Sequence, residues 1–236
     1  MNKLPNGWYV PENEQKVTSV LVRDSNIDNP SYEQKYRDYI LQHIPNKRTF
    51  IDVGANVGIW TRPFTDKFDK IIAYEPSSAN LECLKLNVDK KVDIRDYALA
   101  DFEGEFDFHV GKKNCGDSKL SRNPEKSDYK VAVKMIDNEN LTNVDLIKID
   151  VQGWELNVLK GAETIIKRDK PWLIWEINDD VDICCNFMEE LGYEMLHLKS
   201  KRVFLWAPLE GENKPAENLF GRWLGLGPYV DRLVVK

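Results

Sequence analysis

Short apolar segments alternate with amphipathic ones along this chain, and that alternation constrains the fold more than any other feature. Four segments are mainly apolar and too short for typical helices: 49–53, 70–76, 145–151 and 171–177. Apolar runs of this kind are typical of parallel strands that are covered on both faces. The segments 77–88 and 154–168, which lie between them, carry apolar residues at helical spacing. The pattern therefore predicts an α/β fold with a doubly wound, Rossmann-like and mostly parallel sheet.

The other segments extend this alternation and divide the chain into three parts. We expect an irregular lead-in at 1–30, one α/β domain at 31–208, and a tail at 209–236 that packs on the same domain. Further helices are predicted at 31–44, 56–68 and 182–191, further strands at 92–100, 104–110 and 130–136, and a C-terminal antiparallel hairpin at 193–199 and 202–208. Ser31 is the expected N-cap of the first helix. The polar segment 111–128 is long enough to be a functional loop.

The composition argues against several classes of protein. Apolar residues make up 42% of the 236 positions, enough for a full core, and the formal net charge is −6. No run of Lys and Arg is long enough to follow a phosphate backbone, so nucleic acid is not an expected partner. No stretch of about 18 apolar residues exists, so we expect no membrane span. The four cysteines form no CxxC pair, which favours reduced thiols in a cytoplasmic protein.

The strongest candidate for a binding site is the sequence FIDVGANVG at 50–58, where a glycine loop follows a strand. Nucleotides bind at this position in open α/β sheets. The spacing Gly54-x-x-x-Gly58 fits neither the GxGxxG pattern of dinucleotide sites nor a P-loop. Asp52 would repel a pyrophosphate but would favour a cation, directly or through water. We therefore expect S-adenosylmethionine, which carries an ammonium, a sulfonium and no phosphate, with Asn56 supplying polar contacts and the glycines permitting close approach.

A second acid lies at the end of the next predicted strand. Glu75, in the sequence IIAYEP, can accept hydrogen bonds from both hydroxyls of a ribose. Sites for NAD use an acid in the same way, so only the combination of Glu75 with the glycine loop favours S-adenosylmethionine. Asp96 and Asp101 flank the end of the third strand, where the adenine amino group would lie. We expect one of these two carboxylates to accept from that amino group.

Five stretches of the sequence together resemble a known family. FIDVGANVG, AYEP, ALADFEGEFDF, DLIKIDVQGWELNVLKGAE and the WEI strand resemble the FkbM family of class I S-adenosylmethionine-dependent methyltransferases. The resemblance runs from about Tyr32 to Pro208, which makes 31–208 a methyltransferase domain. It implies a seven-stranded Rossmann-like sheet and O-methylation of hydroxyls, often on sugars, glycans or polyketide-like products. Gln152 departs from the family, which often has glutamate at that position.

Polar residues at the ends of two neighbouring strands are the candidates for catalysis on such an acceptor. Asp150 and Glu176 each lie at the end of a predicted parallel strand, so both are expected at one rim of the sheet. Lys148 has the same parity as Asp150 and is expected to pair with Asp150 or Glu176. The acids would orient or deprotonate the hydroxyl, with Lys148 tuning them; a purely structural ion pair is an equal alternative. His109 is a further candidate base.

Three alternatives stay open at this stage. A divalent cation held by Asp150, Glu176 and Asn178 would also activate a hydroxyl, but we do not favour it because acid clusters at strand ends are seldom metal sites. The other two are a Rossmann-type nicotinamide oxidoreductase and a catalytically silent cofactor-binding module. We expect a small-molecule or carbohydrate acceptor, although no pattern in the sequence identifies it or the oligomeric state.

Overall fold

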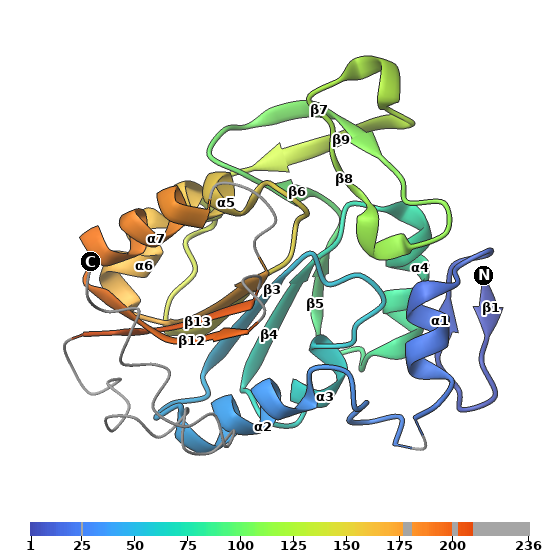
Figure 1. The fold of residues 1–236 in the computed structure, drawn as a ribbon, viewed down its shortest axis with the longest axis horizontal. Coiled ribbons are helices and arrows are strands. Elements are labelled where there is room, and N and C mark those ends of the chain that lie inside the picture. The colour runs from blue at the N-terminus through green and yellow to red at the C-terminus, as the bar shows by residue number, and fades with distance from the viewer. Residues whose placement is uncertain (25, 177–180, 200–202, 210–236) are drawn as a thin grey trace.

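The computed structural model describes residues 1–24, 26–176, 181–199 and 203–209, and its centre is a seven-stranded sheet (Figure 1). The strands lie in the order β12-β13-β11-β10-β3-β4-β5. Their bounds are β3 (Thr49–Val53), β4 (Lys70–Tyr74), β5 (Asp93–Arg95), β10 (Val144–Ile149), β11 (Trp172–Glu176), β12 (Tyr193–Lys199) and β13 (Val203–Pro208). Strands β5, β4, β3, β10 and β11 pair in parallel, whereas β13 is antiparallel to both of its neighbours. The predicted α/β class is confirmed.

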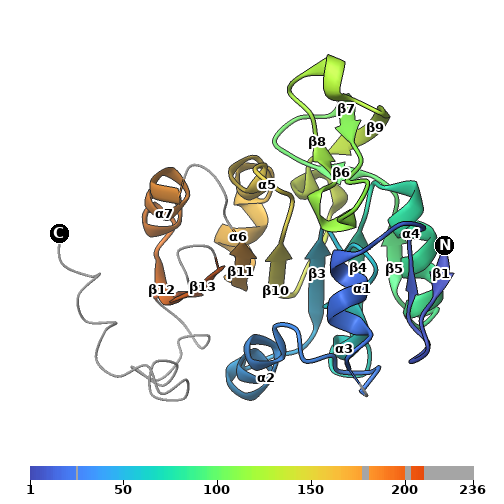
Figure 2. The same cartoon turned by 45° about the vertical axis from the view of Figure 1, so that its right-hand side comes forward.

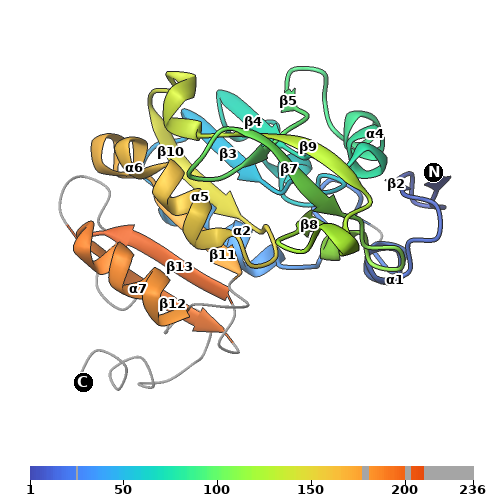
Figure 3. The same ribbon diagram turned by 90° about the horizontal axis from the view of Figure 1, so that it is seen from above.

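Helices cover both faces of this sheet (Figures 1 and 3). One face carries α2 (Gln34–His43), α3 (Thr61–Phe64) and α4 (Ser78–Asn87), and the other carries α5 (Glu155–Gly161), α6 (Glu163–Asp169) and α7 (Val181–Glu190). Side chains alternate between the faces along each strand. Phe50 packs in the first apolar cluster with Tyr39 and Phe64, whereas Ile51 packs in the second with Met188. Burial on both sides explains why these strands are apolar at almost every position.

The helix predicted at 56–68 is much shorter in the structure. Only Thr61–Phe64 is helical. The residues before it form a turn in which Asn56 has a φ of 53° and Gly58 a φ of 98°, and neither value is compatible with a right-handed helix. The sequence pattern was misread here because the apolar residues of a tight turn can imitate helical spacing.

Two other helix predictions were also wrong in detail. The helix expected at 154–168 is split into α5 and α6, which meet at Ala162, where φ is −113° and ψ is 6°. The first helix of the domain begins after Glu33 and not after the expected N-cap Ser31. Glu33 has a left-handed backbone with a φ of 56°, and its side chain does not cap the helix.

A second, four-stranded sheet stands over the ends of the parallel strands (Figure 2). It consists of β6 (Ala98–Leu99), β7 (Gly104–His109), β8 (Lys119–Leu120) and β9 (Tyr129–Lys134), in the order β6-β9-β7-β8. Two short 3-10 turns, η1 (Cys115–Asp117) and η2 (Pro124–Lys126), flank β8, and a third, η3 (Ile136–Glu139), follows β9. The segment 111–128, predicted as a loop, therefore contributes a strand and the two turns η1 and η2 to this sheet, which packs its apolar side on Trp154.

The segment predicted as an irregular lead-in contains regular structure in its first two thirds. It contains β1 (Asn2–Lys3), β2 (Tyr9–Val10) and α1 (Lys16–Leu21). Its Trp8 is fully buried, and the backbone N–H and C=O of Tyr9 exchange hydrogen bonds of 2.8 Å with the Asn87 side chain on α4. The lead-in is therefore anchored to the sheet's helical layer.

The proposed division into 1–30, 31–208 and 209–236 stays a prediction. Beyond Leu209 the tail lies outside the described residues, and so do Asn178 and the acids that follow it. In the described ranges, no helix combines the length and the apolar character that crossing a membrane requires.

Candidate functional site

Two adjoining cavities open where the parallel strands end, beneath the second sheet. The first is lined by residues that follow β4, β5 and β10 and by the segment that leads into and forms β8, among them Glu75, Tyr97, Leu99, Leu120 and Trp154. The second lies between the end of β10, the start of α2 and the N-terminal helix α1, with Lys148 and Glu176 in its wall. Four residues line both: Gly54, Asn56, Gly116 and Asp150. The two cavities thus meet at the glycine loop and at Asp150.

Glu75 is held rigidly at the wall of the first cavity. It follows β4, is only 4% exposed, and accepts the backbone N–H of Asn56 on Oε2 at 2.7 Å and the N–H of Ser77 on Oε1 at 2.8 Å. Burial raises the pKa of Glu75 to about 7, against the lowering effect of these N–H donors. Oε1 also lies 3.5 Å from Asn80 Nδ2, at the limit of a hydrogen bond. Oε2 therefore keeps an open lone pair for a ligand donor, and a second donor at Oε1 would displace only this long contact.

The two glycines of the loop are required by the protein's own packing. Gly54 has a φ of 74°, and a Cβ there would lie 2.0 Å from the carbonyl oxygen of Asp150. Gly58 has a φ of 98°, and a Cβ there would lie 2.9 Å from Val88 Cγ1. Gly54 is therefore required by the close approach of the Asp150 backbone, and Gly58 by side chains in and just after α4. Neither glycine is required by the expected ligand. Gly58 is absent from the linings of both cavities of the described structure.

The backbone N–H groups of this loop already have acceptors. Those of Gly54 and Ala55 donate to Tyr74 O at 3.0 and 2.9 Å, and that of Gly58 donates to Ala55 O at 2.9 Å. The N–H of Asn56 donates to Glu75. Because a phosphate site depends on N–H groups that point at the ligand, this loop is poorly suited to a pyrophosphate.

Lys148 pairs with Asp52 and not with the acids predicted for it. The two residues are direct neighbours on β10 and β3, and Lys148 Nζ lies 3.2 Å from Asp52 Oδ1 and donates to Gly54 O at 2.7 Å. Thr61 Oγ1 donates to Asp52 Oδ2 at 2.6 Å. Burial lowers the pKa of Lys148, but the carboxylates of Asp52 and Asp150 outweigh it and raise the pKa overall. Lys148 therefore stays protonated and is unsuited to act as a base.

Asp52 is completely buried and lines neither of the two cavities formed by the described residues. Asp52 influences the second cavity only indirectly, because it pairs with Lys148, and Lys148 lines that cavity. A direct contact between Asp52 and a ligand ammonium, one of the two routes expected from the sequence, is not available in this geometry.

Asp150 and Glu176 do lie at one rim, as expected for the ends of adjacent parallel strands. Asp150 lines both cavities and accepts from Gln152 Nε2 at 2.7 Å on Oδ1; Glu176 lines the second cavity. Gln152 adopts a left-handed φ of 56°, and Glu155 holds this turn by accepting the N–H of Gly153. Burial raises the pKa of Glu155 to about 7.

Tyr32 and Glu33 complete the second cavity and were missed in the sequence. Glu33 accepts from Trp60 Nε1 at 2.8 Å, and its pKa is raised mainly by burial. Burial and then the carboxylates of Glu33, Glu176 and Asp150 raise the pKa of the Tyr32 hydroxyl, so it stays protonated. No sequence signal marks the two residues, because they reach the rim only through the placement of α2.

Three other predicted site residues lie away from the two cavities of the described chain. His109 has an exposed side chain, with Nδ1 at 3.1 Å from Lys126 O and 3.2 Å from Asp128 Oδ2. Asp101 accepts from Asn157 Nδ2 at 2.9 Å, and Asp96 is exposed. The structure therefore does not support His109 as the base or either aspartate as the adenine acceptor.

Residues between and beyond those aspartates occupy the expected adenine position instead. Tyr97, Leu99 and Trp154 line the first cavity, and Trp154 Nε1 donates to Leu120 O at 2.9 Å. An aromatic just after a strand end, as at Tyr97, was the available signal. Among the described residues, no group of three His, Cys, Asp or Glu side chains is arranged to hold a metal ion.

The chain has recognisable relatives among known proteins. Residues 52–195, more than half of the chain, match the family model described as the methyltransferase FkbM domain. No curated protein matches. Among solved structures, the chain is similar to a methyltransferase FkbM from Methylobacillus flagellatus KT, with 18% identity over 68% of this chain and a TM-score of 0.51. The chain spans only 43% of that protein's length, and at this identity the likeness shows a shared fold.

Two further structures are similar at lower TM-scores. An rRNA methylase from Streptococcus thermophilus has 12% identity and a TM-score of 0.48, covering 75% of this chain and 96% of that one. SMU.1697c, a putative methyltransferase from Streptococcus mutans in complex with SAH, has 14% identity and a TM-score of 0.46, covering 73% and 94%. By the match over 52–195, the chain belongs to the methyltransferase FkbM domain family.

Proposed function

We propose that this protein is an S-adenosylmethionine-dependent methyltransferase that methylates a hydroxyl of a sugar, glycan or other small molecule. The observation that carries the proposal is the setting of Glu75: a buried carboxylate on a cavity whose other wall is apolar and aromatic. A carboxylate with one open acceptor site and a second one held only by the long Asn80 contact suits a ribose diol. Tyr97, Leu99 and Trp154 offer surfaces for the flat face of an adenine.

The loop favours a cofactor without phosphate. Its N–H groups at Gly54, Ala55, Asn56 and Gly58 are all engaged with protein acceptors. A nicotinamide dinucleotide would need such groups for its pyrophosphate. The alternative of an oxidoreductase is therefore less well supported than a methyltransferase.

The second cavity suits the charged end of the cofactor and the acceptor. Glu33, Asp150 and Glu176 line it together with one buried cation, Lys148. The excess of carboxylates favours the ammonium of the methionine portion. When bound, the cofactor supplies a methyl group activated by the sulfonium. Asp150 or Glu176 would orient the acceptor hydroxyl toward that methyl group and take its proton.

A carboxylate base accounts for this chemistry without a metal, so we do not propose a divalent cation as a cofactor. The acceptor is proposed to be a small molecule or carbohydrate, since no basic run in the sequence suits nucleic acid. None of the four cysteines is in a disulfide in the described structure, which supports a reducing compartment such as the cytoplasm.

Calorimetry with S-adenosylhomocysteine and with NAD tests the proposal. We expect binding of S-adenosylhomocysteine in the micromolar range or tighter and no binding of NAD; the reverse result would favour the oxidoreductase. Transfer of a labelled methyl group to a panel of monosaccharides and glycans then separates an enzyme from a silent module. Glu176→Gln, which alters only the second of the two cavities, should lower transfer by a factor of about 100 or more. Binding of S-adenosylhomocysteine should fall much less, because Glu33 and Asp150 still favour its ammonium.

A further inference from the structure

The N-terminal helix α1 forms one wall of the second cavity. Lys16, Val17 and Val20 line it, opposite the rim that carries Asp150 and Glu176. Helix α1 also lies beside the η1 turn, which belongs to the segment that roofs the first cavity (Figures 1 and 3). A helix from the start of the chain is thus placed where the acceptor is proposed to bind, and it touches the cover of the cofactor cavity.

Glu14 joins these two elements. It is 7% exposed, and its Oε1 accepts the N–H of Val17 at 2.7 Å, which fixes the start of α1. Its Oε2 accepts the N–H of Cys115, the first residue of η1. A second bond, from Gln15 N–H to Lys113 O at 3.1 Å, runs parallel to this link. One buried carboxylate therefore satisfies two backbone donors that lie about 100 positions apart in the chain.

Cys115 continues the connection to the glycine loop. Its thiol donates to Asn56 Oδ1 at 3.0 Å, and burial is the main cause of the raised pKa that keeps this thiol protonated. Asn56 in turn donates its N–H to Glu75. A parallel route runs through Asn80, whose Nδ2 donates to Cys115 O at 3.3 Å and lies 3.5 Å from Glu75 Oε1. Polar contacts therefore run without interruption from α1 to the carboxylate proposed to bind the ribose.

We propose that Glu14 is a positioning residue that couples the two cavities, so that cofactor binding at Glu75 orders α1 and completes the wall for the acceptor. The inference rests on the proposed function, because it takes Glu75 as a cofactor ligand. A ligand that fixes Glu75 and Asn56 also fixes Cys115 and, through Glu14, the first turn of α1. By linkage, a more ordered α1 strengthens binding of the cofactor by the same factor.

Hydrogen exchange of the full chain with and without S-adenosylhomocysteine tests this coupling and needs no known acceptor. We expect the ligand to slow exchange of the amides in Lys16–Leu21 by about fivefold or more, the lower end of typical coupling between sites. Helix α6 (Glu163–Asp169) serves as an internal reference and should not respond. Slowed exchange at the glycine loop reports binding itself.

The variant Glu14→Gln offers only one acceptor oxygen, so one of the two backbone N–H groups loses its partner. It should abolish the slowing in α1 and weaken binding of S-adenosylhomocysteine by about fivefold. Glu12→Gln removes the same charge from an exposed position two residues earlier and should behave like the parent protein. Equal protection of α1 in both variants would overturn the proposal.

A second pair of variants keeps the test valid if Glu14→Gln does not fold. Cys115→Ala removes the donor to Asn56 and should reduce the response of α1, because only the route through Asn80 is left. Cys115→Ser keeps a donor and should restore the full response. Tight binding without any response in α1 would refute this inference alone. Failure of S-adenosylhomocysteine to bind the parent protein would refute the proposed function and this inference with it.

Discussion

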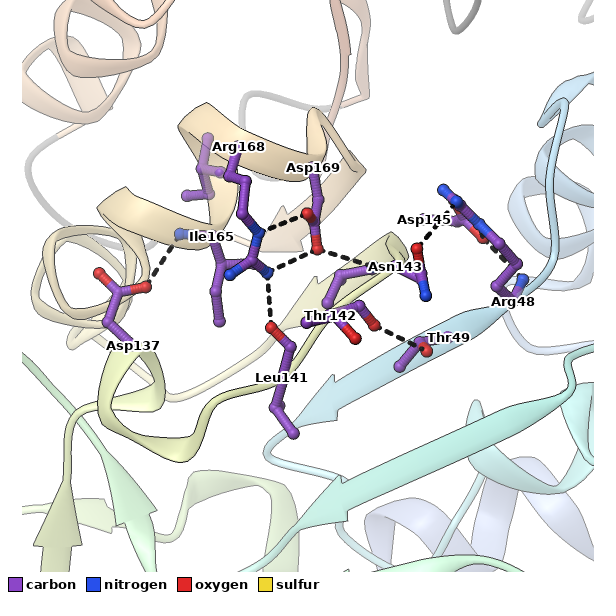
Figure 4. Close-up of polar contacts among 12 residues, drawn as sticks. Arg48, Thr49, Asp137, Leu141, Thr142, Asn143, Asp145, Ile165, Arg168 and Asp169 are labelled. Carbon is purple, nitrogen blue, oxygen red and sulfur yellow. Dashed lines mark hydrogen bonds and ion pairs between the residues drawn. The ribbon is translucent and has the colours of Figure 1, made fainter.

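Both ends of the main sheet carry acids that are buried or partly buried, but the two groups of acids differ in their surroundings. At the amino end, Asp145 accepts Arg48 N–H at 2.6 Å and Arg48 Nε at 3.0 Å on the same oxygen, and Asp169 accepts from Arg168 at 2.6 Å and from Val144 N–H at 2.9 Å (Figure 4). At the carboxyl end, acids such as Glu75 and Asp150 line cavities. Asp145 and Asp169 are paired with arginines and stabilise the fold, whereas Glu75 and Asp150 lie beside cavities, where they can meet a ligand.

The pKa of Asp169 at the amino end is shifted in the opposite direction from the pKa values of Glu75 and Glu33 at the carboxyl end. Burial would raise the pKa of Asp169, but the bonds from Arg168 and the Val144 N–H lower it overall. Burial dominates at the other end, where the pKa of Glu75 is raised to about 7 and that of Glu33 is also raised. A carboxylate that the fold leaves under-compensated gains most from a ligand's donors.

Among the substitutions that test this contrast, replacement of Glu75 is expected to have the largest effect on ligand binding. Glu75→Ala removes both proposed hydrogen bonds to the ribose and should weaken binding of S-adenosylhomocysteine by about 100-fold, or about 3 kcal/mol, in calorimetry. Glu82→Ala, at an exposed position on α4, is the matched control and should bind normally. Equal affinities for the two variants would remove Glu75 from the site.

Replacement of Asp145 tests the other end of the sheet. The side chain of Asp145 is only 2% exposed, and Asp145→Asn removes its ion pair with Arg48. Because a buried pair is broken, the free energy of unfolding should fall by about 2 kcal/mol in urea denaturation. Binding of S-adenosylhomocysteine should stay within about twofold of the parent value, as expected for a distant site. Asp66→Asn, which alters an exposed pair with Lys91, should leave the unfolding curve unchanged. A large loss of affinity in Asp145→Asn would contradict the assignment of a purely structural role to the acids at the amino end.

The pH dependence of binding should follow Glu75. With a pKa of about 7, its ionised fraction rises about tenfold between pH 6 and pH 8, and affinity for S-adenosylhomocysteine should rise with it. The stability of the unliganded fold has the opposite sign: the raised pKa contributes stability below the unfolded value near 4.5 that is lost as pH rises through 7. Glu75→Gln should flatten the binding profile; an unchanged slope would assign the titration to another group.

The smallest expected effect is at the cap of α6. Asp137 accepts the N–H groups of Thr164 at 2.8 Å and Ile165 at 3.0 Å, one on each oxygen. Asp137→Asn keeps one acceptor and should reduce the free energy of unfolding by about 0.5–1 kcal/mol, with no change in ligand binding. Any effect on affinity would show that the amino end communicates with the cavities.

The sequence predicted the parallel core well because each central strand is apolar on both faces and bounded by a turn. It did not predict the second sheet or the anchoring of the lead-in, since both depend on partners that are distant in the chain, as in the contact of Tyr9 with Asn87. The split at Ala162 was also hidden, because apolar spacing continues across it.

The site was predicted where a residue's position in a strand fixes its location. Glu75, Asp150 and Glu176 lie at strand ends, and the structure places all three beside the cavities. Parity alone gave the wrong partner for Lys148, because its neighbour across the ladder is Asp52. Tyr32 could not have been found, since α2 brings it to the rim only in the folded chain.

A crystal structure with S-adenosylhomocysteine is the most direct test of the central claim, that the acids at the carboxyl end meet a ligand which those at the amino end never contact. We expect ribose hydroxyls within hydrogen-bonding distance of Glu75, the adenine between Tyr97 and Trp154, and the sulfur facing the second cavity, which Asp150 and Glu176 line. A ligand bound elsewhere, or a ribose that leaves Glu75 without contact, would contradict it.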